Sequence, residues 1–373
     1  MRPASTPVQR PRDARLLVVD AAGAIAQRPR RELAALLDAG DVLVANDAAT
    51  LPASLSGRHV ASGATIEVRL AGRRSLQSDD VERFVAVVFG AGDHRVRTED
   101  RAPAPAIRAG DALALGPLAA TVIRVLDPAR LIELRFHGDA DAIRAGLACH
   151  GRPVQYAHIA APLALWDVQT AIAARPVAFE APSAGFVLDW RVLDSLARRG
   201  VVFRSLTHAA GLSSTGDPAL DARLPFDEPY EVPGATVDAV RAARRCGGRV
   251  VALGTTVARA LEHAAARPGG LIAGPGLATN RLGRGTRLRV VDTLVTGTHE
   301  PGSSHHELLR AFVAEETLSR IDAELEAAGF RTHEFGDSMW VERSVAAWRR
   351  SPASWSCSDA SERAAETADA AAC

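Results

Sequence analysis

The sequence RLRVVDTLVTGTHEPGSSHHELLRAF, residues 287–312, is the stretch that best indicates the fold of this chain. Its first part, residues 288–295, is apolar and rich in β-branched side chains, which predicts a buried strand. A polar segment with one proline and two glycines follows and predicts a loop. From Ser303 onward the pattern is that of a helix, so the predicted order is strand, loop, helix.

Polar side chains gather in this loop and at the start of the helix. In an open α/β sheet such a loop lies at the carboxyl end of a strand, where ligands usually bind. The candidate site residues here are Thr296, His299, Ser303 and Ser304. Either serine can equally well be only a helix cap, because Glu307 follows at the spacing of a capping box. The local pattern leaves both interpretations open.

The composition supports a large folded core without indicating a macromolecular partner. The chain has 373 residues, of which 47% are hydrophobic, which is enough for two domains. Lys+Arg and Asp+Glu both number 44, so no overall positive charge indicates a nucleic-acid partner. A local basic patch is still compatible with this balance.

Signals for disulfides, metals and membranes are weak or missing. The four cysteines are scattered and form no CxxC pair, so neither a zinc site nor a disulfide framework is predicted. The run His305-His306-Glu307 does not predict a metal site, because adjacent histidines diverge on a helix and HExxH is absent. No apolar run is long enough to cross a bilayer, and the N-terminus lacks the apolar segment of a signal peptide. We expect a cytoplasmic protein without a membrane partner.

Two kinds of pattern divide the chain. In residues 57–138, short alternating segments such as ATIEVRL and ERFVAVVF are separated by Gly, Asp and Pro, which is typical of an antiparallel barrel. Elsewhere predicted strands alternate with predicted helices. We therefore predict an α/β core of residues 1–56 and 139–345, an inserted antiparallel β-barrel of residues 57–138, and a disordered Ser- and Ala-rich tail of residues 346–373.

The predicted core elements follow from local hydrophobic patterns. Strands are expected at residues 15–20, 41–45, 201–206 and 249–253. Helices are expected at residues 32–37, 139–148, 167–174, 189–199, 257–266 and 315–328. The Gly-, Ser-, Asp- and Pro-rich residues 211–227 predict a long loop, and in a compact domain such a loop is either functional or mobile.

Several polar residues follow these predicted strands. Asn46 and Asp47 come directly after one of them, where such residues are as often turn formers as ligands. His208 follows another, a position that is more often structural than catalytic. Glu228 lies in the segment FDEPYEV and is a candidate base, although a carboxylate in an exposed loop is usually only solvated.

A tight turn, Gly254-Thr255-Thr256, precedes the helix expected at 257–266. A turn of this kind at a helix N-terminus offers free backbone N–H groups and hydroxyls to an anion or to the polar edge of a ligand. It is not a Walker loop, because the Gly-Lys-Ser/Thr part is missing.

A series of segments gives the chain a family resemblance. In order they are ARLLVVD, DVLVANDAATLPASL, DVQTAIAARPVAFEAPSAGF, LTHAAG, FDEPYEVP, ALGTTVARALE, RVVDTLVTGTHEPGSS and FGDSMWV. The series resembles the S-adenosylmethionine:tRNA ribosyltransferase-isomerase family of queuosine biosynthesis, and the chain looks like a divergent member of it. The resemblance covers the chain from Arg12 to Val341.

The resemblance implies a fold and a reaction. The fold is an α/β core with an inserted β-barrel. Family members move the ribosyl part of S-adenosylmethionine onto the aminomethyl group of a 7-aminomethyl-7-deazaguanine base in tRNA. Adenine and methionine leave, and the tRNA then carries epoxyqueuosine. S-adenosylmethionine is thus a co-substrate and tRNA a partner, and we expect a monomer with no metal and no tightly bound cofactor.

The chemistry of this reaction calls for polar loops. The sulfonium acidifies the adjacent 5′ carbon, so a positioned base can remove a proton there, and adenine needs a proton or donor as it leaves. By their position in the matching segments, we predict His299 and Glu228 for proton transfer, with His208 as second choice. The predicted substrate-binding residues are Asn46, Asp47, Gln169, Thr170, Gly254, Thr255, Thr256, Ser303 and Asp337.

The chain also departs from the family pattern. The family motif Asn-Phe-His-Leu-Pro-basic-Ser-Thr is replaced by GTHEPGSS, which loses an amide, an aromatic ring and a positive charge. The Arg of Asn-Asp-Thr-Arg becomes Ala49, the Tyr of Tyr-Gln-Thr becomes Val168, and the His of His-Ser-Glu becomes Phe226. Aromatic and Arg side chains stack on bases and hold phosphates, so these changes bear on RNA binding.

Three functions therefore compete at the level of sequence. The first is the tRNA ribosyltransferase-isomerase activity itself, favoured by the persistent order of the segments. The second is S-adenosylmethionine chemistry on another, non-tRNA acceptor, favoured by Ala49, Gly297 and Gly302. The third is a non-catalytic protein that binds a nucleoside or RNA, suggested by Phe226 and Val168.

Overall fold

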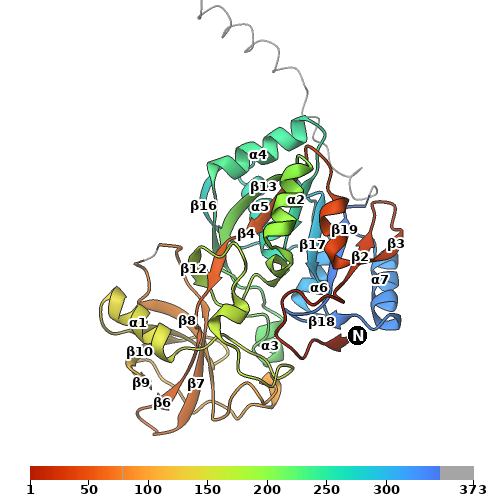
Figure 1. Ribbon diagram of the computed structural model, residues 1–373. Coiled ribbons are helices and arrows are strands. Elements are labelled where there is room, and N and C mark those ends of the chain that lie inside the picture. The colour runs from red at the N-terminus through yellow and green to blue at the C-terminus, as the bar shows by residue number, and fades with distance from the viewer. Residues whose placement is uncertain (78, 345–373) are drawn as a thin grey trace, which may run out of the picture.

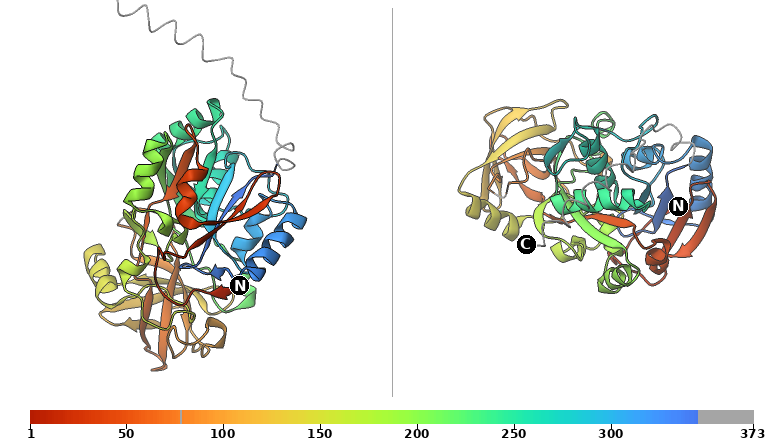
Figure 2. Two further views of the ribbon diagram at one scale, coloured as in Figure 1. Left: turned by 45° about the vertical axis from the view of Figure 1, so that its right-hand side comes forward. Right: turned by 90° about the horizontal axis from the view of Figure 1, so that it is seen from above.

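A computed structural model describes residues 1–77 and 79–344 of the chain. The tail predicted at residues 346–373 lies outside the described residues, as do Cys357 and Cys373. Two units stand side by side in Figures 1 and 2, an α/β unit and a β-barrel. The predicted fold class, an α/β core with an inserted antiparallel β-barrel, is confirmed.

A nine-stranded sheet forms the centre of the α/β unit, in the order β16-β14-β13-β4-β15-β17-β19-β2-β3. Its four middle strands pair in parallel. These are β4 (Val42–Asn46), β13 (Val202–His208), β15 (Val250–Leu253) and β17 (Thr293–Gly297). The flanking strands are β2 (Arg15–Val19), β3 (Ile25–Pro29), β14 (Glu228–Val232), β16 (Gly274–Ala278) and β19 (Ser338–Glu342).

Both faces of the sheet are covered, as parallel strands require. Along β4, Val42 and Val44 pack into one core cluster, while Leu43 and Ala45 pack into another on the opposite face. The first face is covered by α4 (Gly234–Arg245), α5 (Thr255–Ala266), α6 (Ser304–Leu309) and α7 (Glu315–Ala327). The second face is covered by α2 (Trp190–Arg198) and the 3₁₀ helices η1 (Arg30–Leu36) and η4 (Ser183–Val187).

The second unit is a closed barrel with the strand order β10-β11-β8-β7-β6-β9. Its strands pair antiparallel and surround a core of alternating apolar side chains. They are β6 (Ser54–His59), β7 (Thr65–Gly72), β8 (Arg83–Phe89), β9 (Ala112–Leu115), β10 (Leu118–Val125) and β11 (Leu131–Phe136). The predicted boundary at residue 57 falls inside β6, because the strand pattern continues back to Ser54. Helix α1 (Ala140–His150) packs on the barrel through Ile143 and Leu147.

Several short elements lie outside the large sheet and the barrel strands. Strand β1 (Arg2–Pro3) pairs with β18 (Arg331–Thr332), and β5 (Ala48–Thr50) pairs with β12 (Arg175–Ala178). The remaining short helices are η2 (Thr98–Asp100), η3 (Leu165–Val168) and α3 (Pro218–Asp221). In the described part of the chain, no helix has the length and apolar character needed to cross a membrane.

Tertiary contacts overrode two of the local predictions. The helix expected at residues 167–174 is absent, because the Gln169 side chain instead bonds both backbone groups of Thr50, at 3.0 and 2.9 Å. The strand expected at residues 288–295 begins only at Thr293. Before it, the buried Glu262 carboxylate accepts hydrogen bonds from the backbone N–H groups of three successive residues, Arg289, Val290 and Val291.

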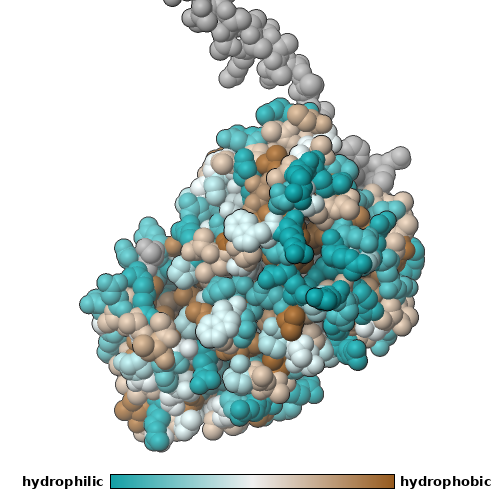
Figure 3. Space-filling view, in the orientation of Figure 1, coloured by the Kyte–Doolittle hydropathy of each residue, from teal (hydrophilic) through white to brown (hydrophobic). Residues whose placement is uncertain are grey.

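The surface in the view of Figure 3 mixes hydrophilic residues with scattered hydrophobic ones. Two tryptophans are the most exposed large hydrophobic side chains among the described residues, Trp166 at 77% and Trp190 at 83%. They lie on different elements, η3 and α2. Single exposed apolar side chains of this kind are ordinary on a protein surface.

Candidate active site

A cavity lies at the carboxyl ends of the central strands. One wall is formed by Thr296 and Gly297 of β17 and by the turn after β15. The other walls come from residues 180–184, 210–213 and 333–334. Because the central strands are parallel, their carboxyl ends meet at one edge, and this edge is where ligands bind in open α/β sheets.

The cavity brings together some of the predicted site residues. Those that line it are His299, Glu228, Gly254, Thr255 and Thr256. Ser304 also lines it, whereas Ser303 is the N-cap of α6 and accepts the His306 N–H at 3.2 Å. The predicted capping box is incomplete, because the Glu307 side chain pairs with Arg310 instead.

His299 is half-buried at the end of β17, with its ring enclosed by polar neighbours. Its Nε2 lies 2.8 Å from the Thr296 Oγ1, and its ring stacks on that of His305, with 4.9 Å between the ring centroids. Burial, followed by the nearby imidazoles of His305, His306 and His333, holds the pKa of His299 well below its ordinary value. The imidazole is therefore neutral at physiological pH and has a lone pair available for a proton.

Glu228 is buried at the first residue of β14, not in an exposed loop as its sequence context suggested. Its carboxylate pairs with Arg259 and accepts the Gly211 N–H at 2.6 Å. Burial alone raises the pKa of Glu228, but His208, Arg259 and the Gly211 N–H together bring the pKa below its ordinary value. The carboxylate is thus ionised and held in place, which suits a fixed negative charge better than a proton acceptor.

His208 is fully buried behind Glu228 and is not among the residues that line the cavity. Its Nε2 lies 3.2 Å from the Glu228 Oε2, but neither ring nitrogen has a well-aligned hydrogen-bond partner within the described structure. The ring packs edge-on against Tyr230, with 6.4 Å between the centroids. This placement favours a supporting role over the direct proton transfer that the sequence suggested as second choice.

The turn after β15 positions the start of α5 against the cavity. Gly254 has a φ of 108°, a backbone conformation that residues with a Cβ atom rarely adopt. Thr255 and Thr256 follow as the first residues of α5, so the free N–H groups of this helix point toward the cavity end of the sheet. Asn46 supports the turn through Thr256 Oγ1, at 3.4 Å.

Other predicted binding residues are tied into the protein itself. Asn46 bonds the backbone of His208 through both ends of its amide, each at 2.9 Å. Asp47 accepts the hydroxyls of Ser205 and Thr207, at 2.8 and 2.6 Å. These residues lock the end of β4 to the end of β13 and support the cavity from behind.

Three further predictions also fall outside the cavity lining. Asp337 is buried between Arg15 and Arg331, at 2.9 and 3.1 Å, and so joins β2 to the turn before β19. Gln169 holds the backbone of Thr50. Thr170 is buried, and its hydroxyl has no hydrogen-bond partner in the described structure. Direct contact of these side chains with a ligand stays a prediction.

The cavity also contains functional groups that the sequence did not single out. Glu180 accepts hydrogen bonds from the Tyr156 hydroxyl and from the Ser213 N–H, the latter at 3.0 Å. Burial raises the pKa of Glu180 to about 7. The segment EAPSAGF was interpreted only as a turn, and nothing local in it indicates that its carboxylate is enclosed. Arg259 likewise appeared only as a helix residue.

The chain is similar to proteins of one family over most of its length. The family model described as queuosine biosynthesis protein matches residues 2–341. An S-adenosylmethionine:tRNA ribosyltransferase-isomerase of Pelobacter propionicus is 33% identical over 84% of this chain and 88% of its own length. The enzyme of the same name from Thiobacillus denitrificans is 35% identical over 88% of this chain and 90% of its own length.

A solved structure also matches. It is an S-adenosylmethionine tRNA ribosyltransferase from Thermotoga maritima, with 23% identity and a TM-score of 0.47, and the match covers 91% of this chain and 95% of that one. The family model and the curated relatives extend over most of the chain, including both the barrel and the cavity walls. The chain therefore belongs to the S-adenosylmethionine:tRNA ribosyltransferase-isomerase family of queuosine biosynthesis proteins.

Proposed function

We propose that this protein transfers and isomerises the ribosyl part of S-adenosylmethionine onto a tRNA base, and that the cavity beside β15 and β17 is its active site. The observation that carries the proposal is the family match over residues 2–341, together with curated relatives of that activity at 33–35% identity. The cavity supports it, because it places an unprotonated imidazole, carboxylates and a helix N-terminus around one space.

The first step needs a base next to the sulfonium. We assign His299 this role, because its depressed pKa keeps the imidazole neutral and Thr296 fixes the orientation of the ring. The proton comes from the 5′ carbon, which the adjacent sulfonium acidifies. The ring of His305 stacks on that of His299 and helps to hold it in place.

Loss of adenine needs a proton on the leaving nitrogen. Glu180 is suited to supply it, because a carboxyl group with a pKa of about 7 is partly protonated at neutral pH. Tyr156 and the Ser213 N–H hold this group on the wall formed by residues 180–184. Glu180 and His299 would thus act as acid and base from separate walls of the cavity.

The remaining polar groups suit the rest of the co-substrate. The N-terminus of α5 and the hydroxyls of Thr255 and Thr256 can bind the carboxylate or ribose hydroxyls of S-adenosylmethionine. The fixed negative charge of Glu228 stabilises the sulfonium cation of S-adenosylmethionine. In this account S-adenosylmethionine is a co-substrate, the acceptor is the 7-aminomethyl-7-deazaguanine base of tRNA, and the enzyme acts as a cytoplasmic monomer.

One assay tests the function. The protein is incubated with S-adenosylmethionine and with tRNA that carries the deazaguanine precursor, and adenine and the modified nucleoside are measured by chromatography. Matched reactions contain tRNA without the precursor, or the free base alone. We expect adenine release only with the precursor tRNA. Adenine release only with the free base would show that the free base, and not tRNA, is the acceptor. No release in any reaction would contradict the proposed activity.

A further inference from the structure

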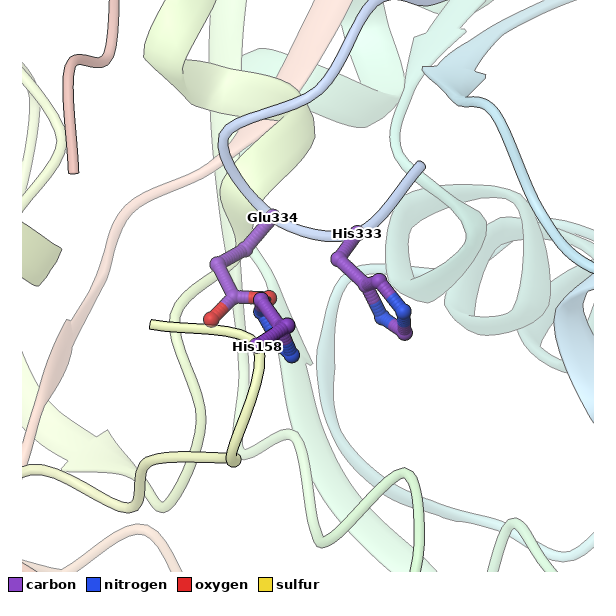
Figure 4. A group of neighbouring side chains, drawn as sticks. All are labelled: His158, His333 and Glu334. Atoms are coloured by element: carbon purple, nitrogen blue, oxygen red, sulfur yellow. The ribbon is translucent and has the colours of Figure 1, made fainter. Parts of the chain in front are cut away.

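Three metal-ligand side chains meet at the rim of the cavity. They are His158, from the segment after α1, and His333 and Glu334, from the turn between β18 and β19. One ligand atom from each lies within 4.8 Å of the other two. Figure 4 shows the Glu334 carboxylate beside the His158 ring, with His333 rising from the same turn as Glu334.

The contacts within this group are close and polar. The His158 Nε2 lies 3.2 Å from the Glu334 Oε2. The rings of His158 and His333 stack, with 4.2 Å between their centroids and 12° between their planes. The group therefore brings imidazole nitrogens and a carboxylate oxygen together in one place, and these atoms are ligands of transition metals.

The backbone presents this group in an unusual conformation. His333 has a φ of 68° and is the one non-glycine residue with a positive φ in the described part of the chain. Such a conformation is uncommon for residues with a Cβ atom and costs on the order of 1–3 kcal/mol. The turn is held by the bond from the Gly336 N–H to the His333 carbonyl, at 2.9 Å, and by the buried Asp337. The protein thus maintains a strained turn that places two potential ligands at the cavity.

We propose that His158, His333 and Glu334 bind one divalent transition-metal ion, with Zn²⁺ as the best match. Two imidazoles and one carboxylate are a ligand set that zinc uses where a further coordination position stays open. Because His333 and Glu334 line the cavity, this open position faces the space where substrate is expected. The proposal departs from the sequence-based expectation of no metal, since 176 positions separate His158 from Glu334 and no spacing motif reveals them.

Binding requires a small rearrangement of side chains. Stacked rings cannot both direct a lone pair at one ion, so one imidazole must turn. His333 has room for this movement, because its side chain is 36% exposed. Glu300 lies 3.4 Å from the His333 Nε2, where it can accept the N–H of the ring and orient the other nitrogen toward the ion.

Two other close pairs that contain histidine are poorer candidates for a metal site. His299 and His305 stack at 4.9 Å, and His306 lies 3.0 Å from Asp322. Within the ranges that the structure describes, neither pair belongs to a group of three ligand atoms at comparable separations. The ligand count therefore favours the group at the cavity rim.

Metal binding can be measured without substrate, so the result is independent of the proposed enzymatic function. Protein freed of metal by a chelator is titrated with Co²⁺, whose visible absorption reports its coordination, and then with competing Zn²⁺. We expect one ion per chain in the unmodified protein. His158→Gln and Glu334→Gln should each weaken binding at least about tenfold, because each removes a ligand.

Matched variants separate this site from other histidines. His137→Gln, on the exposed end of the barrel strand β11, should leave the affinity unchanged. If His158→Gln fails to fold by circular dichroism, His333→Gln provides the same test. The proposal is overturned if the folded protein shows no saturable binding, if the ligand variants bind as tightly as the unmodified protein, or if affinity is lost only in His305→Gln.

Discussion

At the scale of single residues, the cavity sets titratable groups to different charge states. His299 is kept neutral by burial and by neighbouring imidazoles, whereas Glu228 is kept ionised by Arg259 and His208. Glu180 lies between these cases, because its burial is not balanced by a cation and its pKa rises to about 7. Groups with separated pKa values are what acid and base catalysis requires.

Replacing His299 tests the base. His299→Gln keeps a polar side chain but cannot take up the proton, so we expect adenine release to fall by about 10²–10⁴-fold in kcat. The KM for S-adenosylmethionine should change much less, since the backbone groups of α5 remain. Steady-state kinetics of adenine release measure both constants. Thr296→Val, which removes only the hydroxyl beside the ring, should cause a smaller loss, and an unchanged kcat in His299→Gln would falsify the assignment.

The raised pKa of Glu180 makes a prediction about stability. Its folded-state pKa is about 7 against an ordinary value of 4.5, so folding favours the protonated form. The contribution of this group to stability is therefore fully present below pH 4.5 and is lost as the pH rises to 7. Compared with Glu180→Gln, the unmodified protein should lose up to about 3 kcal/mol of unfolding free energy over this range. Urea denaturation at several pH values measures the difference, and parallel curves would contradict the predicted pKa.

At the scale of elements, the start of α5 depends on one glycine. The turn must reverse direction between β15 and α5 while its N–H groups stay free, and Gly254 does this with a φ of 108°. The same helix uses Glu262 to bind three backbone N–H groups just before β17. Helix α5 therefore follows the carboxyl end of β15 at its own N-terminus and holds the segment before β17 through Glu262.

Gly254→Ala should disturb this element. A Cβ atom at this backbone conformation is strained, so we expect a loss of about 1–3 kcal/mol in unfolding free energy and weaker S-adenosylmethionine binding. Denaturant titration and calorimetry provide the two measurements. Gly234→Ala is a matched control, because an added Cβ there meets nothing within 4 Å and lies in the first turn of α4. Equal stability of both variants would show that the turn tolerates a side chain.

At the scale of the whole molecule, the α/β unit and the barrel share part of a core. Phe179 follows β12, yet its ring packs in the barrel core against Phe84 of β8, with 6.0 Å between the centroids. Leu212 and Leu220, from the long segment 211–227, join the same cluster. Glu180 comes directly after Phe179, so packing of the barrel helps to place a cavity residue.

This coupling can be tested with Phe179→Ala. Loss of a buried phenylalanine should cost about 3–5 kcal/mol. Because Phe179 follows a strand outside the barrel and packs in the barrel core, we expect the two units to unfold in one transition. Thermal unfolding followed by calorimetry and by fluorescence measures both effects. Trp166→Ala, at a 77% exposed position, should change stability by no more than about 0.5 kcal/mol. Two separate transitions in the unmodified protein would disprove the coupling.

The sequence by itself indicated most of the elements and the location of the candidate site. Local apolar periodicity indicated the central strands, and the alternating segments indicated the barrel. The residues around His299 and Gly254 indicated the edge of the sheet where the candidate site lies. Such features depend on neighbours within a few positions along the chain. The order of the motifs along the chain also indicated the protein family.

Only the tertiary structure decided which side chains meet and in what charge state. It buried Glu228 against Arg259, enclosed Glu180 beside Tyr156, and brought His158 to Glu334 across 176 positions of sequence. It also turned Asn46 and Asp47 into supports of the sheet. The physical reason is that pKa values and ligand geometry depend on distances and burial, which are set by contacts between segments that are remote in the chain.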